Sequence, residues 1–402
     1  FSHRLQNLPP YLFAELDCLK EEAVKQGRDV IDLGVGDPDL STPQPAVEEL
    51  CREASKNRNQ HYPSNRGLLE FRQAIAEWYE KRFNVSLNPQ TEILPLIGSK
   101  EGIAHIPAAF INPGDLALVP DPAYPAYRSG IILAGGIPYS LPLLKENSFL
   151  PALNKIKKGI VQKAKLLFLN YPNNPTAAIA PPEFLQEAVE FAQKHNIVLC
   201  YDNAYSEIAF GGYRPKSILE MKGAKDVAVE FHSLSKTYNM TGWRIGWVCG
   251  QAKIIAALAK LKSNIDSGIF LAIQKAGVSA LNLENKKTMK IYERRKNILA
   301  QGLRKLGWDV ESPRATFYFW LCLPLGFKSS LEFSRMLLKE KNVIVTPGVG
   351  FGRYGEGYFR IALTVSEQRI EEAINRLQVT SHKLQGPQSQ VTSKESKLHK
   401  PN

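Results

Sequence analysis

The sequence has no apolar run long enough to cross a membrane, no CxxC pair and no internal repeat. A membrane-spanning helix needs about 18 or more apolar residues, so the chain is not predicted to cross a bilayer. Its five cysteines are odd in number and widely spaced, which argues against a disulfide framework and favours a reducing compartment. We therefore expect a cytoplasmic protein, while the start at Phe1 leaves a preceding targeting segment open.

Acidic side chains are outnumbered: 39 Asp and Glu stand against 51 Lys and Arg, and the formal net charge is +12. Such an excess can indicate a nucleic-acid or membrane partner. Here the lysines are scattered and concentrate only at 155–165 and beyond residue 381, which favours solvated faces and a basic tail. We predict no nucleic-acid partner, no membrane partner and no metal site.

A GxGxxG motif after the first strand is also missing, which argues against a Rossmann dehydrogenase although strands and helices alternate. Helical patterns over 68–83 and 181–196 lie among continuous apolar runs, which are typical of strands buried on both faces. These runs are 93–97, 116–120, 165–170, 197–202, 227–233 and 245–250. The alternation predicts an α/β fold with a mainly parallel sheet, whose functional residues gather at the carboxyl ends of its strands.

The length of 402 residues allows two domains, and the pattern of apolar and charged residues changes near residue 282. Residues 1–45 are predicted to form an N-terminal arm with one helix, over 13–26, and part of the small domain. Residues 46–281 are predicted to form the large domain. A long charged helix and the strand-like runs 317–323, 343–348 and 358–363 indicate a smaller α+β domain over 282–380. The apolar-poor stretch 381–402 is predicted to be a disordered basic tail.

The most informative segment is SLSKTYNMTGWRIGW at 233–247. It follows a predicted buried strand, so Ser233, Ser235 and Lys236 are expected at the strand's carboxyl end, with Arg244 further on. An amine there can form an imine with an aldehyde, while hydroxyls and a guanidinium can hold a phosphate. A surface lysine after a strand is an equally good interpretation of this segment alone.

Three other segments place polar or aromatic side chains after predicted strands. In IVLCYDNAYSEI, Asp202 can pair with a protonated pyridine nitrogen and Tyr205 can hydrogen-bond a ring oxygen. In NYPNNPT, Asn174 offers an amide, although this motif alone is more often just a turn. In DPAYPAY, Tyr124 can stack on a planar ring or simply form a proline-braced turn.

Two further segments offer groups for anions. In GSKEG, Ser99 is expected to start a helix, whose backbone N–H groups suit a phosphate, or merely to cap that helix. In YFRIAL, Arg360 lies between Phe359 and Ile361, where it can clamp a carboxylate. An arginine in a strand is usually a surface residue, and that alternative stays open.

Taken together and in this order, the motifs resemble the fold type I pyridoxal 5′-phosphate (PLP) aminotransferases, in the aspartate aminotransferase-like branch, over about residues 10–378. The resemblance implies PLP as the cofactor, a seven-stranded mainly parallel sheet, and Lys236 as the Schiff-base lysine and general base. It implies that Asp202 binds the pyridine nitrogen and that Tyr124 stacks on the ring. The other implied cofactor-binding residues are Tyr205 and Asn174 at the ring oxygen and Ser99, Lys100, Ser233, Ser235 and Arg244 at the phosphate.

The resemblance also implies a homodimer with shared active sites, because Tyr62, in HYPSNRG, matches the tyrosine that reaches the phosphate of the neighbouring subunit. Arg360 matches the arginine that binds the substrate α-carboxylate, with Asn174 beside it. Gly36 would line the substrate pocket through its backbone. Tyr11 would lie at the partner's substrate pocket.

Within the family, PPYLFAELD, GVGDPD, GSKEGIAHIPAAF and DPAYPAY are similar to the enzymes that act on LL-2,6-diaminopimelate in lysine biosynthesis. This implies ping-pong transamination with 2-oxoglutarate. One departure is Asn65, near the position of a glutamate that recognises the distal end of the substrate in plant-type enzymes. Polar candidates for the pocket are Glu101, Asn264, Asp266 and Ser267, for which roles in surface loops are an equally good interpretation. An aspartate, alanine or aromatic aminotransferase and a PLP-dependent β-lyase share the cofactor residues and stay open, whereas a regulator is disfavoured because no winged-helix segment precedes the motifs.

Overall fold

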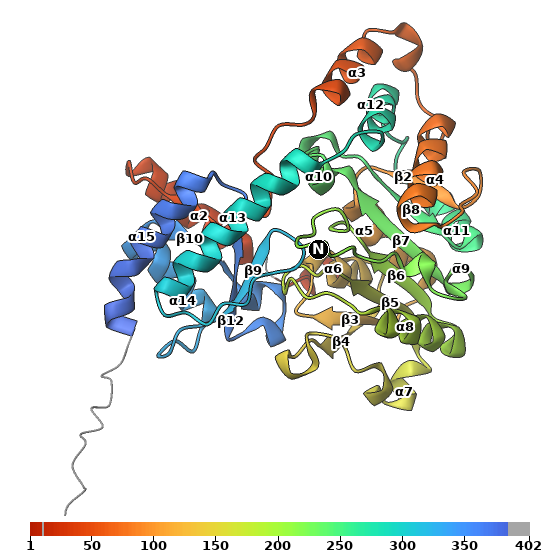
Figure 1. Ribbon diagram of the computed structural model, residues 1–402. Helices are drawn as coiled ribbons and strands as arrows, with labels where there is room; N and C mark the ends of the chain where they lie inside the picture. The colour runs from red at the N-terminus through yellow and green to blue at the C-terminus, as the bar shows by residue number, and fades with distance from the viewer. Residues whose placement is uncertain (10–11, 385–402) are drawn as a thin grey trace, which may run out of the picture.

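The computed structural model describes residues 1–9 and 12–384, and its centre is a seven-stranded sheet with the order β2-β8-β7-β6-β5-β3-β4 (Figure 1). Strand β8 runs in the opposite direction to the other six strands of this sheet, so the predicted mainly parallel sheet is confirmed. The strands are β2 (Ile93–Leu96), β3 (Leu116–Asp121), β4 (Ile137–Pro142), β5 (Ala164–Asn170), β6 (Val198–Asp202), β7 (Ala228–Ser233) and β8 (Gly246–Gly250).

The sequence missed one strand of this sheet, β4. It lies at the edge of the sheet, paired only with β3, and most of its residues are partly exposed. An edge strand therefore lacks the continuous apolar run by which the six buried strands could be identified.

Helices cover both faces of the sheet, because successive side chains of a strand point to opposite faces. Val119 and Phe168 face one apolar cluster and Leu118 and Leu167 face the other. The first cluster is completed by α5 (Ser99–Phe110), α6 (Pro125–Leu133) and α11 (Ala252–Lys262). The second is completed by α3 (Gln44–Ala54), α4 (Leu69–Phe83), α8 (Pro182–His195) and α12 (Leu271–Leu281). The short helices α7 (Lys158–Val161), α9 (Ala224–Val227) and α10 (Leu234–Thr237) lie in the connections between strands, and α1 (His3–Gln6) lies near the N-terminus.

A second group of elements surrounds a three-stranded antiparallel sheet of order β11-β12-β9. Its strands are β9 (Tyr318–Cys322), β11 (Thr346–Pro347) and β12 (Tyr358–Ala362). The helices of this group are α2 (Leu12–Lys25), α13 (Lys286–Lys305), α14 (Ser330–Met336) and α15 (Glu367–Leu384). Helix α15 extends past residue 381, where the basic tail was predicted to start, and residues 385–402 lie outside the described part of the chain.

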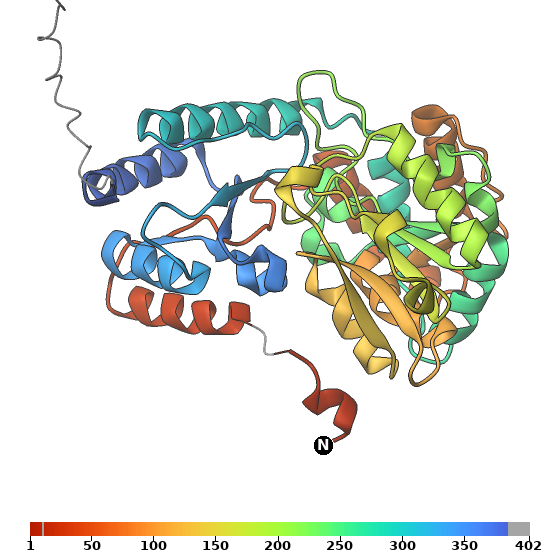
Figure 2. The same cartoon turned by 90° about the horizontal axis from the view of Figure 1, so that it is seen from below.

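The N-terminal segment joins this second group through β1 (Ile31–Asp32), which pairs in parallel with β10 (Val343–Ile344). Lys20 of α2 lies 2.6 Å from the Asp32 carboxylate. Figure 2 shows the red helix α2 beside the blue C-terminal elements. The pairing brings residues 33–36 to the boundary between the two groups. The predicted domain limits at 45, 281 and 380 stay a prediction.

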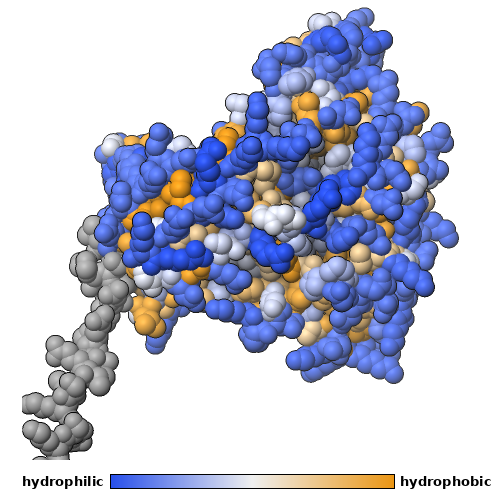
Figure 3. Space-filling view, viewed as in Figure 1, coloured by the Kyte–Doolittle hydropathy of each residue, from blue (hydrophilic) through white to orange (hydrophobic). Residues whose placement is uncertain are grey.

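The surface is mainly polar on the face drawn in Figure 3, where paler residues gather near the centre. Across residues 1–9 and 12–384, no helix is both long and apolar enough to cross a membrane.

Candidate active site

A cavity of about 740 Å³ lies at the carboxyl ends of β5, β6 and β7 and is closed on its other side by β12 and residues 34–36. Its volume falls within the range of small-molecule sites, roughly 300–1,000 Å³. Most of the predicted site residues line it, although they come from opposite parts of the sequence. These are Gly36, Ser99, Lys100, Tyr124, Asn174, Asp202, Tyr205, Ser233, Ser235, Lys236, Arg244 and Arg360.

Lys236 lies in the short helix α10, directly after β7, and its Nζ donates a hydrogen bond to the Gly36 carbonyl at 2.9 Å. Burial lowers the pKa of Lys236 to about 8; Asp37 opposes this fall, and the cations Arg360 and Arg244 add to it. A lysine with a lowered pKa has a larger neutral, nucleophilic fraction near neutral pH than an ordinary lysine.

Asp202 ends β6 at the floor of the cavity and is almost completely buried. Its Oδ2 accepts a hydrogen bond from the Tyr127 hydroxyl at 2.7 Å. Burial raises the pKa of Asp202 to about 6, against the opposing effect of the Tyr127 hydrogen bond. Above that pH the group is a buried carboxylate, which is suited to pair with a protonated ring nitrogen.

Arg360 reaches the cavity from β12 and is only 5% exposed, which excludes the surface alternative. Its Nη1 donates to Asn174 Oδ1 and its Nη2 to the Gly34 carbonyl, each at 2.7 Å. The guanidinium carbon lies 4.2 Å from the centre of the Tyr318 ring. The planar guanidinium is thus fixed by the walls of the cavity, an arrangement that suits recognition of a carboxylate.

Gly36 is packed directly against Tyr318, since a Cβ at position 36 would lie 2.1 Å from the tyrosine Oη. Glycine permits this close approach of the backbone to the wall of the cavity. The Tyr318 hydroxyl lies 3.1 Å from that of Tyr205. The sequence reasoning missed Tyr318, because an aromatic run such as FYFWLCL does not reveal which ring faces a cavity.

At the other end of the cavity, donors for an anion converge. Ser99 opens α5, which is preceded by Gly98 at φ +73°. A Cβ on Gly98 would lie 2.2 Å from Arg244 Nη2, so the guanidinium lies directly over this turn. Ser233 caps α10 by accepting a hydrogen bond from the Ser235 backbone N–H at 3.1 Å. A helix N-terminus, a guanidinium and hydroxyls together are suited to bind a phosphate.

The structure does not bring every predicted residue to this cavity. Tyr62 does not line it and is 87% exposed, and Tyr11 lies outside the described residues. The four polar candidates for the substrate pocket also do not line it. Two of them, Glu101 and Asp266, instead pair with Lys262 at 3.2 and 2.7 Å.

Comparison with known proteins places the chain among aminotransferases. The family model "Aminotransferase class I and II" matches residues 28–377. The LL-diaminopimelate aminotransferase of Aquifex aeolicus is 54% identical over 94% of this chain and 98% of its own length. That of Moorella thermoacetica is 51% identical over 94% of this chain and 97% of its own.

Solved structures are similar over nearly the whole chain. Substrate-bound BacF from Bacillus subtilis has a TM-score of 0.92 and 37% identity, covering 95% of this chain and 98% of BacF. Aspartate aminotransferase from Thermotoga maritima has a TM-score of 0.89 and 30% identity, covering 95% of this chain and 100% of that enzyme.

Proposed function

The chain belongs to the class I and II aminotransferases, and we propose that it transfers an amino group from LL-2,6-diaminopimelate to 2-oxoglutarate. The family resemblance seen in the sequence is confirmed. The enzyme is a PLP-dependent aminotransferase of fold type I, whose substrates are an amino acid and a 2-oxo acid. The proposal of LL-diaminopimelate as the amino donor is supported by the named relatives, which are 51–54% identical over almost their full length.

The groups around the cavity fit the cofactor. Lys236, an amine of lowered pKa, matches the aldehyde of PLP. Asp202, a buried carboxylate, matches the protonated pyridine nitrogen, and the turn at Gly98 beneath Arg244 matches the phosphate. When bound, PLP supplies an electron sink for the negative charge that develops at the substrate Cα. We propose that Lys236 binds the aldehyde and, once its amine is free, takes the proton from that Cα.

The remaining cofactor contacts follow from the placement of the lining residues. Asp202 would keep the ring nitrogen protonated, because a buried carboxylate favours a positive partner. Tyr124 would stack on the ring, and Tyr205 and Asn174 would hydrogen-bond its oxygen. The phosphate would be held by Ser99, the Lys100 backbone, Ser233, Ser235 and Arg244.

For the substrate, we propose that Arg360 and Asn174 bind the α-carboxylate while the Gly36 backbone lines the pocket. The support is geometric: the Arg360 guanidinium is buried at the cavity wall and already oriented by Asn174 and Gly34. A charge-assisted pair between a fixed guanidinium and a carboxylate is strong and directional.

We also propose a homodimer in which Tyr62 completes the phosphate site of the partner subunit and Tyr11 its substrate pocket. Tyr62 is a large side chain left 87% exposed, and Ile265 and Phe270 are also exposed. In the proposed dimer these exposed side chains would lie against the partner subunit. For location we propose the cytoplasm, which the free state of all five cysteines supports.

The observation that carries the proposal is the meeting of Lys236, Asp202 and Arg360 at one cavity. Its test is a panel of amino donors offered to the holoenzyme with 2-oxoglutarate, with glutamate formation as the readout. We expect the highest kcat/KM with LL-diaminopimelate, ahead of aspartate, alanine and aromatic amino acids. Good aspartate turnover beside no turnover of LL-diaminopimelate would overturn the substrate assignment.

The same assay tests the catalytic lysine. Lys236→Ala should lose steady-state transamination by at least about 10²–10⁴-fold, the usual contribution of a general base. Lys286→Ala, at a lysine whose side chain is 75% exposed, is the matched control and should retain parental activity. A Lys236→Ala enzyme that turns over near the parental rate would refute the assignment.

A further inference from the structure

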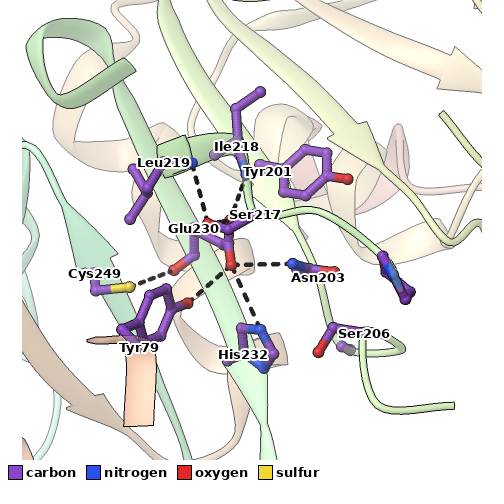
Figure 4. A network of polar contacts seen from close by, with 12 residues as sticks. Tyr79, Tyr201, Asn203, Ser206, Ser217, Ile218, Leu219, Glu230, His232 and Cys249 are labelled. Atoms are coloured by element: carbon purple, nitrogen blue, oxygen red, sulfur yellow. Dashed lines mark hydrogen bonds and ion pairs between the residues drawn. The ribbon is translucent and has the colours of Figure 1, made fainter. Parts of the chain in front are cut away.

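A carboxylate without any assigned role, that of Glu230, is buried within a network of polar contacts (Figure 4). It lies on β7 and is 0% exposed, and it does not line the cavity. An ionised group so far from water is costly unless its oxygens are fully hydrogen-bonded. Figure 4 shows side chains from several elements pointing at it.

Four donors satisfy the Glu230 carboxylate. The Tyr79 hydroxyl, at 2.9 Å, and Asn203 Nδ2, at 3.0 Å, donate to Oε1. The Ser217 hydroxyl, at 2.6 Å, and the Ile218 backbone N–H, at 2.8 Å, donate to Oε2. Every partner donates, which is what an ionised, acceptor-only carboxylate requires.

Two residues near this carboxylate are direct neighbours of active-site residues in the chain. Asn203 immediately follows Asp202, and His232 immediately precedes Ser233. The Asn203 backbone N–H also donates to the Phe231 carbonyl at 2.9 Å. The turn that leaves β6 is therefore attached to β7 twice, once through its backbone and once through the Asn203 side chain.

His232 is held in the same cluster. Its Nε2 lies 3.5 Å from Glu230 Oε1, and its ring is stacked on Trp247 with the centres 5.1 Å apart. The exits of β6 and β7, which carry Asp202 and Ser233, are thus packed around one buried carboxylate.

The charge of Glu230 also acts on Asp202. Burial is the main cause that raises the pKa of Asp202 to about 6, and the negative Glu230 contributes to the same rise. The two carboxylates are therefore coupled electrostatically as well as through Asn203.

We propose that Glu230 is a positioning residue of the aminotransferase: through Asn203 and β7 it holds Asp202 where its carboxylate meets the ring nitrogen of the cofactor. The inference rests on the proposed role of Asp202. A purely structural Glu230 would affect the stability of the folded protein but not the binding of PLP by the molecules that fold.

The test uses Glu230→Gln in the full chain, which keeps the shape of the side chain and removes its charge and one acceptor. We expect the dissociation constant of PLP to rise about tenfold, as when an outer-shell partner of a binding group is lost. The visible absorption band of the bound cofactor should shift, and kcat should fall with the KM of the amino donor unchanged, because Arg360 is not affected. Tyr79→Phe is the matched control: it removes one donor from the same carboxylate on the α4 side, so Tm should fall while PLP affinity and absorption stay parental.

A Glu230→Gln protein with lower Tm but parental PLP affinity and absorption would overturn the proposal. If this variant does not fold, Asn203→Ala tests the same connection with Glu230 intact: a rise in the PLP dissociation constant supports the proposal, and a parental value overturns it. Asp202→Asn separates the two levels of the argument. An unchanged absorption band in that variant would refute the role of Asp202 itself, and the inference with it.

Discussion

Lys236 and Asp202 are two ionisable residues whose pKa values burial moves toward neutrality from opposite sides. The pKa of Lys236 falls to about 8 and that of Asp202 rises to about 6. In both cases the low-polarity surroundings disfavour the charged form. Between these values Asp202 is charged and Lys236 is still largely protonated, so the neutral amine becomes abundant as the pH passes 8.

This environment predicts the reactivity of Lys236 in the apoprotein. Only the neutral amine is a nucleophile, and a lowered pKa makes it available at lower pH, so its acylation rate should rise to a half-maximum near pH 8. Peptide mass spectrometry after brief treatment with an acylating reagent measures this. The peptide that carries Lys286, a lysine whose side chain is 75% exposed, serves as the internal reference for the amount of reagent in the same digest. A Lys236 acylation rate without a half-maximum near pH 8 would contradict the prediction.

At the scale of elements, a buried ion network connects α11 with the turn at Gly98, where the donors for an anion converge. The Lys262 ammonium, 2% exposed, pairs with Glu101 and Asp266. Glu101 Oε2 also accepts a hydrogen bond from the Ile97 backbone N–H at 3.0 Å, directly before Gly98. Glu101, one of the polar candidates for the substrate pocket, therefore holds the backbone directly before Gly98 instead.

Removal of Lys262 should be costly for this reason. Lys262→Met leaves two nearly buried carboxylates without their cation, so the free energy of unfolding should fall by about 3–5 kcal/mol. Denaturant unfolding of the apoprotein measures it. Lys286→Met makes the same change in a pair whose side chains are 75% and 73% exposed, and should leave the denaturation midpoint almost unchanged. Equal losses of unfolding free energy in the two variants would contradict the prediction that burial makes the Lys262 ion pairs costly to break.

The proposed sharing of active sites between two subunits concerns the whole molecule, and complementation tests it. Tyr62→Ala and Lys236→Ala enzymes should each have little activity. In a hybrid dimer one site receives Lys236 from one subunit and Tyr62 from the other, so it is intact. Because a twofold interface pairs the same surfaces, random reassociation of equal amounts should restore about a quarter of the parental activity. Two variants that stay inactive after mixing, although hybrids form, would contradict a shared site.

Several features of the fold and the site could be predicted from short segments. The buried strands were visible as continuous apolar runs; Asp202 ends one of them, and Lys236 lies in the short helix that follows another. The edge strand β4 was not visible because half-exposed residues interrupt its pattern. The proposed role of Glu230, in the middle of a strand, could not be predicted, because a charged residue in an apolar run does not reveal which hydrogen-bond donors surround it.

The sequence by itself therefore determined the strand–helix alternation and the chemistry at each strand end, since both depend on neighbouring residues in the chain. Only the tertiary structure decided which distant groups meet. It placed Arg360 in the cavity rather than on the surface, and it packed Gly36 against Tyr318. It also left Tyr62 outside this cavity. The physical reason is that burial and contact depend on how β12 and the N-terminal segment pack against the large sheet, which no local pattern encodes.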